Sequence, residues 1–307
     1  MDKRGRHYLA ALLLFILVPG LLCHIPGPAL GYEPPVGIFL SSKIRPYLQA
    51  LHGLEDEIDF DYQVFDLSEN FELAKHYAKS RRFQTCVAIG PEAIKLLYKY
   101  GSAIPNKLAI MALDLEKLIG NHKICGIDLR IPIDFQLKVI REKFGPGKKV
   151  AVLYNQAENG AIIEKAKEAA KSQGLILVPL EVNSPSQIME KLTPTFSTVD
   201  IILFIPDSVV ISEKVVSHIT KTALLNGVAV CGFNRFFYET GALLSFIIDY
   251  EEIGREAARL LEKLIREHLC IFEPPKVKLL WNRRALKILM RTRPDKWKEL
   301  NFVGTEE

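Results

Sequence analysis

From Val36 onward, short apolar runs alternate along the chain with amphipathic stretches. This alternation is typical of βαβ units, in which helices connect parallel strands. Several runs are continuous in Val, Ile, Leu and Ala, as expected for strands covered by helices on both faces. The predicted strands are 36–40, 62–66, 85–89, 107–112, 149–154, 175–181, 200–204 and 228–232. The pattern therefore predicts an α/β fold with parallel sheets flanked by helices.

The intervening stretches carry helix signals. Gly90-Pro91-Glu92 places a proline in a first turn and an acid near the positive end of the helix dipole. Asn155 can cap a helix that runs to about Ser172, where Gly174 ends it. Between 250 and 268 the apolar residues share one face, and the charged residues form i,i+4 pairs on a solvated face.

Four predicted strands precede an extended segment at 125–132, and a fresh series of strands and helices follows it. A chain of 307 residues is long enough for two domains with separate cores. We therefore expect two lobes with a boundary near Gly126 to Pro132.

The N-terminus has the pattern of an export signal. Three basic residues precede an apolar run at 8–18, and Ala-Leu-Gly at 29–31 is a cleavage site of the small-x-small type. We therefore predict a signal peptide at 1–31 and a mature chain beginning at Tyr32. Two alternatives are a lipidated Cys23, although Leu22 precedes it, and an uncleaved anchor at 8–30, which prolines and glycines interrupt. All three place the folded part outside the cytoplasm, and we expect the periplasm.

Composition and charge exclude several classes of protein. With 49% hydrophobic residues the chain is not disordered. Lys and Arg number 40 against 36 Asp and Glu, so there is no strongly basic face and no nucleic-acid partner is expected. No GxGxxG follows the first strand of either half, and Lys149 stands where a phosphate loop needs Ser or Thr. We expect no cofactor.

Four cysteines remain after the signal segment: Cys86, Cys125, Cys231 and Cys270. Their spacing suits no metal site, so none is expected. Cys86 and Cys231 lie in predicted strands, where a free cysteine behaves as a small apolar residue. Buried thiols are therefore the favoured interpretation, and a disulfide stays open as an alternative in an oxidising compartment.

Ligands of parallel sheets bind outside the carboxyl ends of the strands, where helix N-termini present N–H groups. With two lobes facing each other, these ends line one cleft, and here they are rich in hydroxyl and amide groups. The histidines have no partner at catalytic spacing, and no catalytic motif is present, so we predict binding of a small polar solute without catalytic residues. Asn155, Asp207 and Ser208 are equally well explained as helix caps. The candidate ligand-binding residues are Ser41, Ser42, Gly90, Pro91, Asn155, Asp207, Ser208 and Asn234.

The segments 228–234, 239–250 and 253–261 resemble the ABC transporter substrate-binding protein family of the type I periplasmic-binding-protein fold. The likeness is to the branch that binds amino acids, and it extends over about 107–264. It implies two Rossmann-like lobes joined by three crossings, with 34–127 plus 240–270 in one lobe and 128–239 plus 271–307 in the other. It supports the candidates above other than Ser208 and adds Asp249 as a ligand contact.

The chain departs from the family pattern in two places. Phe65-Asp66-Leu67-Ser68 runs almost directly into a helix, without the usual longer loop. Asn234 is followed by Arg235-Phe236-Phe237-Tyr238, where an arginine could pair with a ligand carboxylate and an aromatic ring could cover a flat solute. We expect Phe236 and Phe237 to pack instead.

The resemblance implies an exported, monomeric solute-binding protein that delivers a small polar molecule, such as an amino acid, to an ABC permease in the inner membrane. One alternative is an enzyme with two Rossmann-like lobes, such as a nucleotide-sugar transferase. Another is a sensory binding protein tethered to the membrane by an uncleaved N-terminus.

Overall fold

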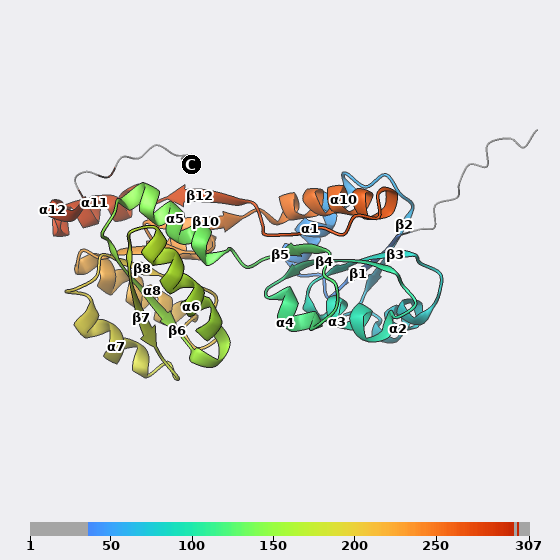
Figure 1. Ribbon diagram of the computed structural model, residues 1–307, viewed down its shortest axis with the longest axis horizontal. Helices are drawn as coiled ribbons and strands as arrows, with labels where there is room; N and C mark the ends of the chain where they lie inside the picture. Colours follow the sequence, from blue (N-terminus) through green and yellow to red (C-terminus); the bar gives the residue numbers. More distant parts are fainter. Residues whose placement is uncertain (1–35, 298–299, 301–307) are drawn as a thin grey trace, which may run out of the picture. The chain divides into compact units, whose positions relative to one another are not determined.

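The computed structural model describes residues 36–297 and residue 300, which form two six-stranded sheets with helices on both faces (Figure 1). The predicted signal peptide at 1–31 lies outside the described residues. The α/β fold with parallel sheets is confirmed. Each of the eight predicted strands is present, with ends that agree within one residue.

The first sheet has the strand order β11-β5-β4-β3-β1-β2, and all its strands are parallel. The strands are β1 (Val36–Leu40), β2 (Tyr62–Asp66), β3 (Thr85–Ile89), β4 (Asn106–Ala112), β5 (Gly126–Asp128) and β11 (Phe272–Glu273). Helices α1 (Arg45–Glu55) and α10 (Tyr250–Arg266) pack on one face of this sheet. On the other face lie α2 (Phe71–Lys79), α3 (Pro91–Tyr100) and α4 (Leu115–Ile119).

The second sheet has the strand order β12-β10-β9-β8-β6-β7. Its strands are β6 (Lys149–Tyr154), β7 (Ile176–Glu181), β8 (Ile201–Leu203), β9 (Ala229–Gly232), β10 (Leu244–Ile248) and β12 (Val277–Trp281). Only β12 is antiparallel to its neighbour in this sheet. The helices are α5 (Ile133–Phe144), α6 (Gln156–Ser172), α7 (Gln187–Thr195), α8 (Glu213–Leu225), α9 (Arg235–Thr240), α11 (Arg283–Thr292) and α12 (Pro294–Trp297).

Successive strand residues serve the two faces of each sheet, as the two-residue period of a strand requires. In β1, Ile38 packs toward α1 and α10, whereas Phe39 packs toward α2 and α3. In β6, Val152 packs toward α5 and α6, whereas Leu153 packs toward α7 and α8. Each lobe therefore has two apolar layers of its own, one on each side of its sheet.

The chain passes from one sheet to the other three times, and two of the expected boundaries are wrong. The strand β10 belongs to the second sheet, so the second crossing lies at about Asp249 and not at 240. The strand β11 pairs with β5 in the first sheet, which moves the third crossing from 270 to Pro274 and Pro275. Neither strand was predicted, so the sequence pattern did not assign these two segments to either sheet.

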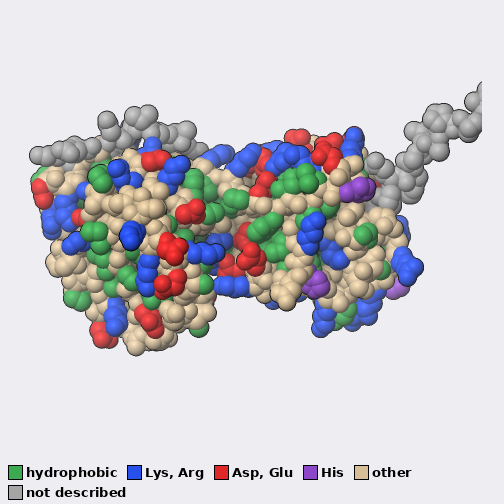
Figure 2. All heavy atoms as spheres, viewed as in Figure 1, with side chains coloured by type: hydrophobic (Ala, Val, Ile, Leu, Met, Phe, Trp, Pro, Cys, Tyr) green, Lys and Arg blue, Asp and Glu red, His purple; other side chains and the backbone are tan. Residues whose placement is uncertain are grey.

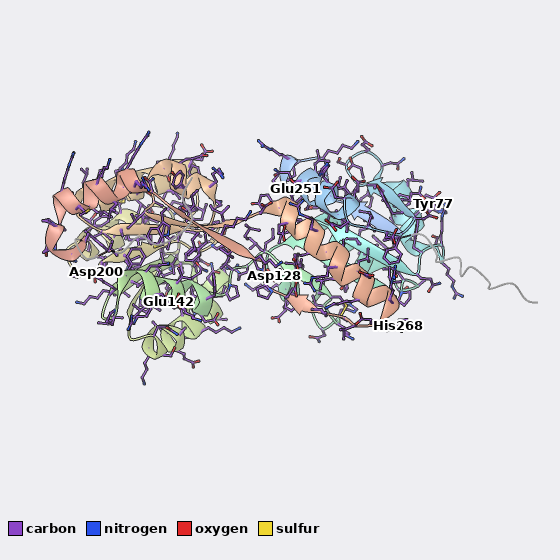
Figure 3. All side chains as sticks on the ribbon, turned by 90° about the horizontal axis from the view of Figure 1, so that it is seen from above. Tyr77, Asp128, Glu142, Asp200, Glu251 and His268 are labelled. Atoms are coloured by element: carbon purple, nitrogen blue, oxygen red, sulfur yellow. A yellow bond between two sulfur atoms is a disulfide. The ribbon has the colours of Figure 1, made fainter. Side chains whose placement is uncertain are left out.

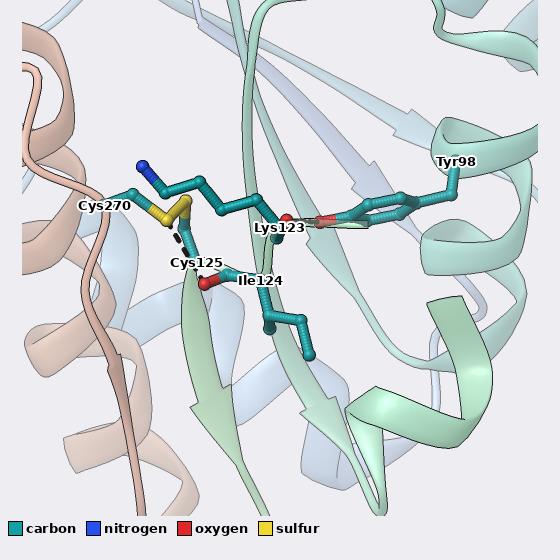
Figure 4. The surroundings of a disulfide bond; sticks show 5 residues. All are labelled: Tyr98, Lys123, Ile124, Cys125 and Cys270. Atoms are coloured by element: carbon teal, nitrogen blue, oxygen red, sulfur yellow. Dashed lines mark hydrogen bonds between the residues drawn. A yellow bond between two sulfur atoms is a disulfide. The ribbon is translucent and has the colours of Figure 1, made fainter. Parts of the chain in front are cut away.

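The expectation of free thiols is wrong for one pair of cysteines, because Cys125 and Cys270 form a disulfide (Figure 4). Each residue precedes one of two neighbouring parallel strands, β5 and β11, which brings their Cα atoms to 5.0 Å. The other two cysteines are buried thiols as expected. Burial raises the pKa of Cys86 to about 12 and also raises the pKa of Cys231. Neither thiol is therefore a reactive thiolate at neutral pH.

Candidate functional site

A small apolar pocket lies where strand ends of both sheets meet the chain crossings. Its volume is about 100 Å³, which is about two thirds of a cavity of ~150 Å³ that holds one benzene molecule. The pocket lies outside the carboxyl ends of parallel strands, as ligand sites of α/β sheets do. Its lining residues are Leu113, Leu129, Ile131, Gln136, Pro206, Phe233, Asn234, Ile248 and Tyr250.

Two leucines form the part of the pocket wall that belongs to the first lobe. Leu113 follows β4, and Leu129 follows β5, so each comes directly after a strand of the first sheet. Leu113 is 41% exposed even though it is a large apolar residue. It therefore offers apolar surface that a ligand could cover.

The second lobe contributes residues that follow β8 and β9. The ring of Phe233 packs against that of Phe237, with 4.8 Å between their centroids. Phe237 is completely buried, as expected, and also contacts Phe204 and Phe236. Asn234 is the N-cap of α9, and its Oδ1 accepts a hydrogen bond from the Phe237 backbone N–H at 3.4 Å. The packing of these rings fixes the part of the wall on which Asn234 is presented.

The remaining pocket residues come from the crossings and the turns next to them. Ile131 belongs to the first crossing, and Ile248 and Tyr250 flank the second. Burial raises the pKa of Tyr250, so its phenol is neutral at physiological pH and offers one O–H donor. The pocket thus combines apolar walls with three polar side chains, those of Gln136, Asn234 and Tyr250.

The carboxylate of Asp207 is the centre of a buried network in the second lobe. It is 4% exposed, and its Oδ2 accepts hydrogen bonds from the Asn155 backbone N–H at 2.7 Å and the Asn159 side-chain amide at 2.8 Å. Its Oδ1 accepts hydrogen bonds from the backbone N–H groups of Val209 and Val210. Asp207 therefore joins the segments that follow β6 and β8, next to Pro206 of the pocket.

Asn155 and Ser208 also have partners within the chain. The Oδ1 of Asn155 accepts the Ala157 backbone N–H at 3.1 Å and caps α6. The backbone N–H and hydroxyl of Ser208 both donate to Glu158 Oε2, at 2.9 and 2.7 Å. Both residues therefore have the capping or turn-forming role that the sequence allowed.

The first-lobe candidates gather at the start of α3. Ser41 Oγ accepts the Ala93 backbone N–H at 2.9 Å, and Pro91 is the first residue of the helix. Gly90 has a φ of 93°, and a Cβ at this position would lie 2.6 Å from Ser41 Oγ, so only glycine fits. Ser42 follows, half-buried. None of these four residues lines the apolar pocket.

Charged side chains surround the first crossing. Arg130 forms an ion pair with Asp114. The nearby carboxylate of Asp128, which is labelled in Figure 3, accepts hydrogen bonds from the backbone N–H groups of Asp114, Leu115 and Arg130. Burial alone would raise the pKa of Asp114, but the Arg130 guanidinium and the Lys117 ammonium lower it overall. Asp114 is therefore held in its charged form beside the crossing.

Two further contacts involve the crossings and the facing lobes. Lys117 Nζ, in the first lobe, donates to the Glu158 backbone carbonyl of the second lobe at 2.9 Å.

At the second crossing, Asp249 caps α10 through the Glu252 N–H and pairs with Lys278 at 2.9 Å. The Lys278 ammonium and the Glu252 N–H outweigh burial and lower the pKa of Asp249. Asp249 thus connects the second crossing to β12.

Of the nine sequence candidates, the structure places Asn234 in the pocket lining and puts Asp207 and Asp249 next to lining residues. Sequence reasoning missed Gln136, although one signal was present. Gln136 interrupts the buried stripe of α5, between Ile133 and Ile140. A polar residue on such a stripe needs an explanation.

One group of side chains in the described residues has the spacing of metal ligands. The ligand atoms of His52 in α1, Asp56 directly after α1 and Glu251 in α10 all lie within 4.8 Å of one another. His52 and Asp56 are exposed, and Glu251 is already paired with Arg255 at 2.8 Å.

On the face shown in Figure 2, Lys, Arg, Asp and Glu side chains are spread over both lobes.

The chain is similar to proteins that bind solutes. The model of the family described as ABC transporter substrate binding protein matches residues 59–273. A tyrosine-binding protein of Clostridioides difficile is 22% identical over 232 residues, which are 70% of this chain and, at 66%, just under two thirds of that protein.

Solved structures share the fold. A ligand-free, open substrate-binding protein with adhesive properties from Clostridium difficile has a TM-score of 0.67 and 16% identity, covering 83% of this chain and 94% of that one. An ABC domain in complex with L-Trp from Streptococcus pneumonia has a TM-score of 0.56 and 16% identity, covering 88% of this chain and 99% of that one.

Proposed function

Because the chain belongs to the ABC transporter substrate-binding protein family, we propose that it captures a small polar molecule, such as an amino acid, between its two lobes. In this proposal the protein is exported and presents the molecule to an ABC permease in the inner membrane. The family consists of substrate-binding proteins and not of enzymes, which removes the alternative of a nucleotide-sugar transferase.

The observation that carries the proposal is the pocket at the strand ends. Its residues come from both lobes and from the crossings, so a solute held there would contact both lobes at once. Binding proteins with two lobes use this arrangement to favour a closed form by hinge motion. In this proposal Asn234 contacts the solute directly. Asp207 and Asp249 hold segments next to the pocket. The remaining sequence candidates lie outside the pocket lining and stay predicted ligand contacts of the wider cleft: Ser41, Ser42, Gly90, Pro91, Asn155 and Ser208.

The names of similar proteins support an amino acid as the solute. One relative is named for tyrosine, and one solved structure contains L-Trp. Leu113, Leu129 and Phe233 give this pocket an apolar wall, and its volume of about 100 Å³ suits a small apolar side chain or part of a larger one.

Export is supported by the signal pattern at 1–31 and by the disulfide, because disulfides persist in oxidising compartments such as the periplasm. Among residues 36–297 and 300, no helix is long and apolar enough to cross a bilayer. N-terminal sequencing of the exported protein separates the proposed cleavage from a tethered sensory form. We expect Tyr32 as the first residue, and an intact N-terminus would favour the tethered form.

The proposal is tested by calorimetric titration of the purified protein with the twenty L-amino acids and a set of monosaccharides. We expect micromolar or tighter binding of one or a few amino acids, and weakening of about tenfold by Asn234→Ala. Glu190→Gln on α7, outside the pocket, is the matched control and leaves affinity unchanged. Absence of binding to every compound would contradict the proposal. Light scattering on the same sample is expected to show a monomer.

A further inference from the structure

Gln136 is a buried polar residue, and only one of its two side-chain amide atoms has a hydrogen-bond partner among the described residues. It lies in the first turn of α5 and is 2% exposed, with Ile133, Leu137 and Ile140 on the same buried side of the helix. Its backbone N–H donates to the Pro132 carbonyl as the helix requires. The side chain is therefore held close to the start of the second lobe.

The orientation of the Gln136 amide is fixed by one hydrogen bond. Its Nε2 donates to the backbone carbonyl of Ile131 at 3.0 Å, and a carbonyl oxygen can only accept. The other amide atom is therefore the acceptor Oε1, and no flip of the amide would satisfy Ile131 equally well. This Oε1 is buried and has no hydrogen-bond partner among the described residues.

Buried side-chain acceptors almost always have a partner in native proteins, because leaving one unpaired costs its desolvation. Gln136 also lines the pocket, whose walls are otherwise mainly apolar, from Leu113, Leu129 and Phe233. A leucine or methionine would fill the stripe of α5 without this cost. An amide that is half satisfied by the protein, at the wall of a ligand pocket, indicates that the missing donor comes from the ligand.

We propose that Gln136 selects the solute by accepting a hydrogen bond from an N–H or O–H group through its Oε1, while apolar walls hold the body of the solute. This inference rests on the proposed function, because it assigns a specificity role within that pocket. It favours a solute with an apolar body and one donor near it, such as an aliphatic or aromatic amino acid. It disfavours sugars, whose hydroxyl groups on all sides would lose hydrogen bonds against Leu113, Leu129 and Phe233.

The same side chain connects the solute to the hinge. Ile131 lies in the first crossing, and its carbonyl is held by the Gln136 Nε2. A solute donor on Oε1 would polarise the amide and strengthen the bond to Ile131. Gln136 would then act on the solute directly and on the crossing through one hydrogen bond.

The test uses pairs of probes that differ by one donor, titrated into protein purified from cells that express the full chain. L-tyrosine against its deaminated carboxylic acid isolates the ammonium donor, and L-tyrosine against L-phenylalanine isolates the phenol donor. Each pair is measured with the wild-type protein, with Gln136→Met, and with Gln84→Met as a matched control on an exposed glutamine of the first lobe. Thermal unfolding of each variant confirms that it is folded.

In the wild-type protein and in Gln84→Met, we expect one pair to be discriminated by about 10- to 100-fold in favour of the member with the donor. In Gln136→Met that preference falls to about threefold or less. If Gln136 only supports Ile131, the variant weakens both members of each pair by the same factor and the preference persists, which overturns the inference. Binding of probes without any preference in the wild-type protein also overturns it but leaves the proposed function intact. Failure of every probe to bind the wild-type protein overturns the inference, whereas the proposed function falls only if no compound of the amino-acid and monosaccharide set binds.

Discussion

The disulfide between Cys125 and Cys270 joins two residues that are 145 positions apart in the sequence and lie just before the neighbouring strands β5 and β11. The first crossing leaves the first lobe directly after β5, and the third leaves it directly after β11. β11 has only two residues and lies at the edge of its sheet. The disulfide therefore fixes the positions from which two of the three crossings leave the first lobe.

Replacing both cysteines, as in Cys125→Ser with Cys270→Ser, is expected to lower the free energy of unfolding by about 2–5 kcal/mol, because a long loop of the unfolded chain is released. Urea unfolding followed by circular dichroism measures this change. Addition of a reductant serves as the control, since it should destabilise the wild-type protein and leave the double variant unchanged. A double variant as stable as the oxidised wild type would contradict the assigned role.

The eight predicted strands were found because each is a short, mainly apolar run between helical stretches, which the local pattern reveals. Four strands were missed. β5 and β11 are short, β10 lies within the family-like segment 239–250, and a lysine interrupts the apolar residues of β12. Because these four strands carry or flank the crossings, missing them displaced two lobe boundaries. Neither the partner of Cys125 nor the sheet to which β10 belongs follows from local sequence.

The pocket shows the same division between local and long-range information. The rule about strand ends predicted the position of Asn234, because that residue directly follows a recognisable strand motif. Leu129 directly follows β5 at the start of the first crossing, and Gln136 lies in the helix after that crossing. Both line the pocket because of the way in which the chain passes between the sheets. Ser41 and Gly90 lie at strand ends as predicted, but the pocket lies beside β4 and β5.

The close packing of α1 on α10 depends on glycine at the contact. A Cβ on Gly254 would lie 2.1 Å from the Ala50 backbone oxygen, and one on Gly53 would lie 2.0 Å from the Glu251 oxygen. Helix propensity by itself would favour alanine at Gly254 by about 1 kcal/mol. We expect Gly254→Ala nevertheless to destabilise the protein by about 2–3 kcal/mol, because backbone atoms must move apart. Chemical unfolding measures the change.

Gly147→Ala is the matched control for that substitution. Gly147 has a φ of 72°, but nothing lies within 4 Å of an added Cβ. Alanine should cost only about 1 kcal/mol here, from the left-handed backbone conformation. If Gly254→Ala were as mild as this control, the close approach of the two helices would not be a determinant of stability.

The network around Asp207 predicts a large structural effect at this sequence candidate. Asp207→Ala would remove the acceptor for the Asn155 N–H and for the amide of Asn159, which is itself completely buried. We expect a loss of about 2–4 kcal/mol in the free energy of unfolding, because buried donors lose their partner. Ser208→Ala, which affects only an exposed bond to Glu158, should change stability by less than about 1 kcal/mol. Equal effects of the two substitutions, measured by urea unfolding, would contradict this interpretation.

The ion pair between Asp200 and Lys296 predicts how stability depends on acid. Burial alone would raise the pKa of the Asp200 carboxyl, but the Lys149 N–H at 2.9 Å and the Lys296 ammonium lower it overall. The folded protein therefore binds fewer protons at this site than the unfolded chain. The stabilisation is complete above the unfolded pKa of about 3.9 and is lost as pH falls through the folded pKa.

Asp200→Asn should consequently be less stable than the wild-type protein at neutral pH, and the difference should shrink as pH falls below about 4. Asp128→Asn provides the contrast, because burial raises the pKa of Asp128 despite its three backbone donors. The folded Asp128 takes up its proton at a higher pH than the unfolded chain, so its contribution to stability improves as pH falls. Urea unfolding between about pH 3 and pH 7 measures both dependences. A difference between wild type and Asp200→Asn that grows toward low pH would show that the pKa of Asp200 is not lowered by its partners.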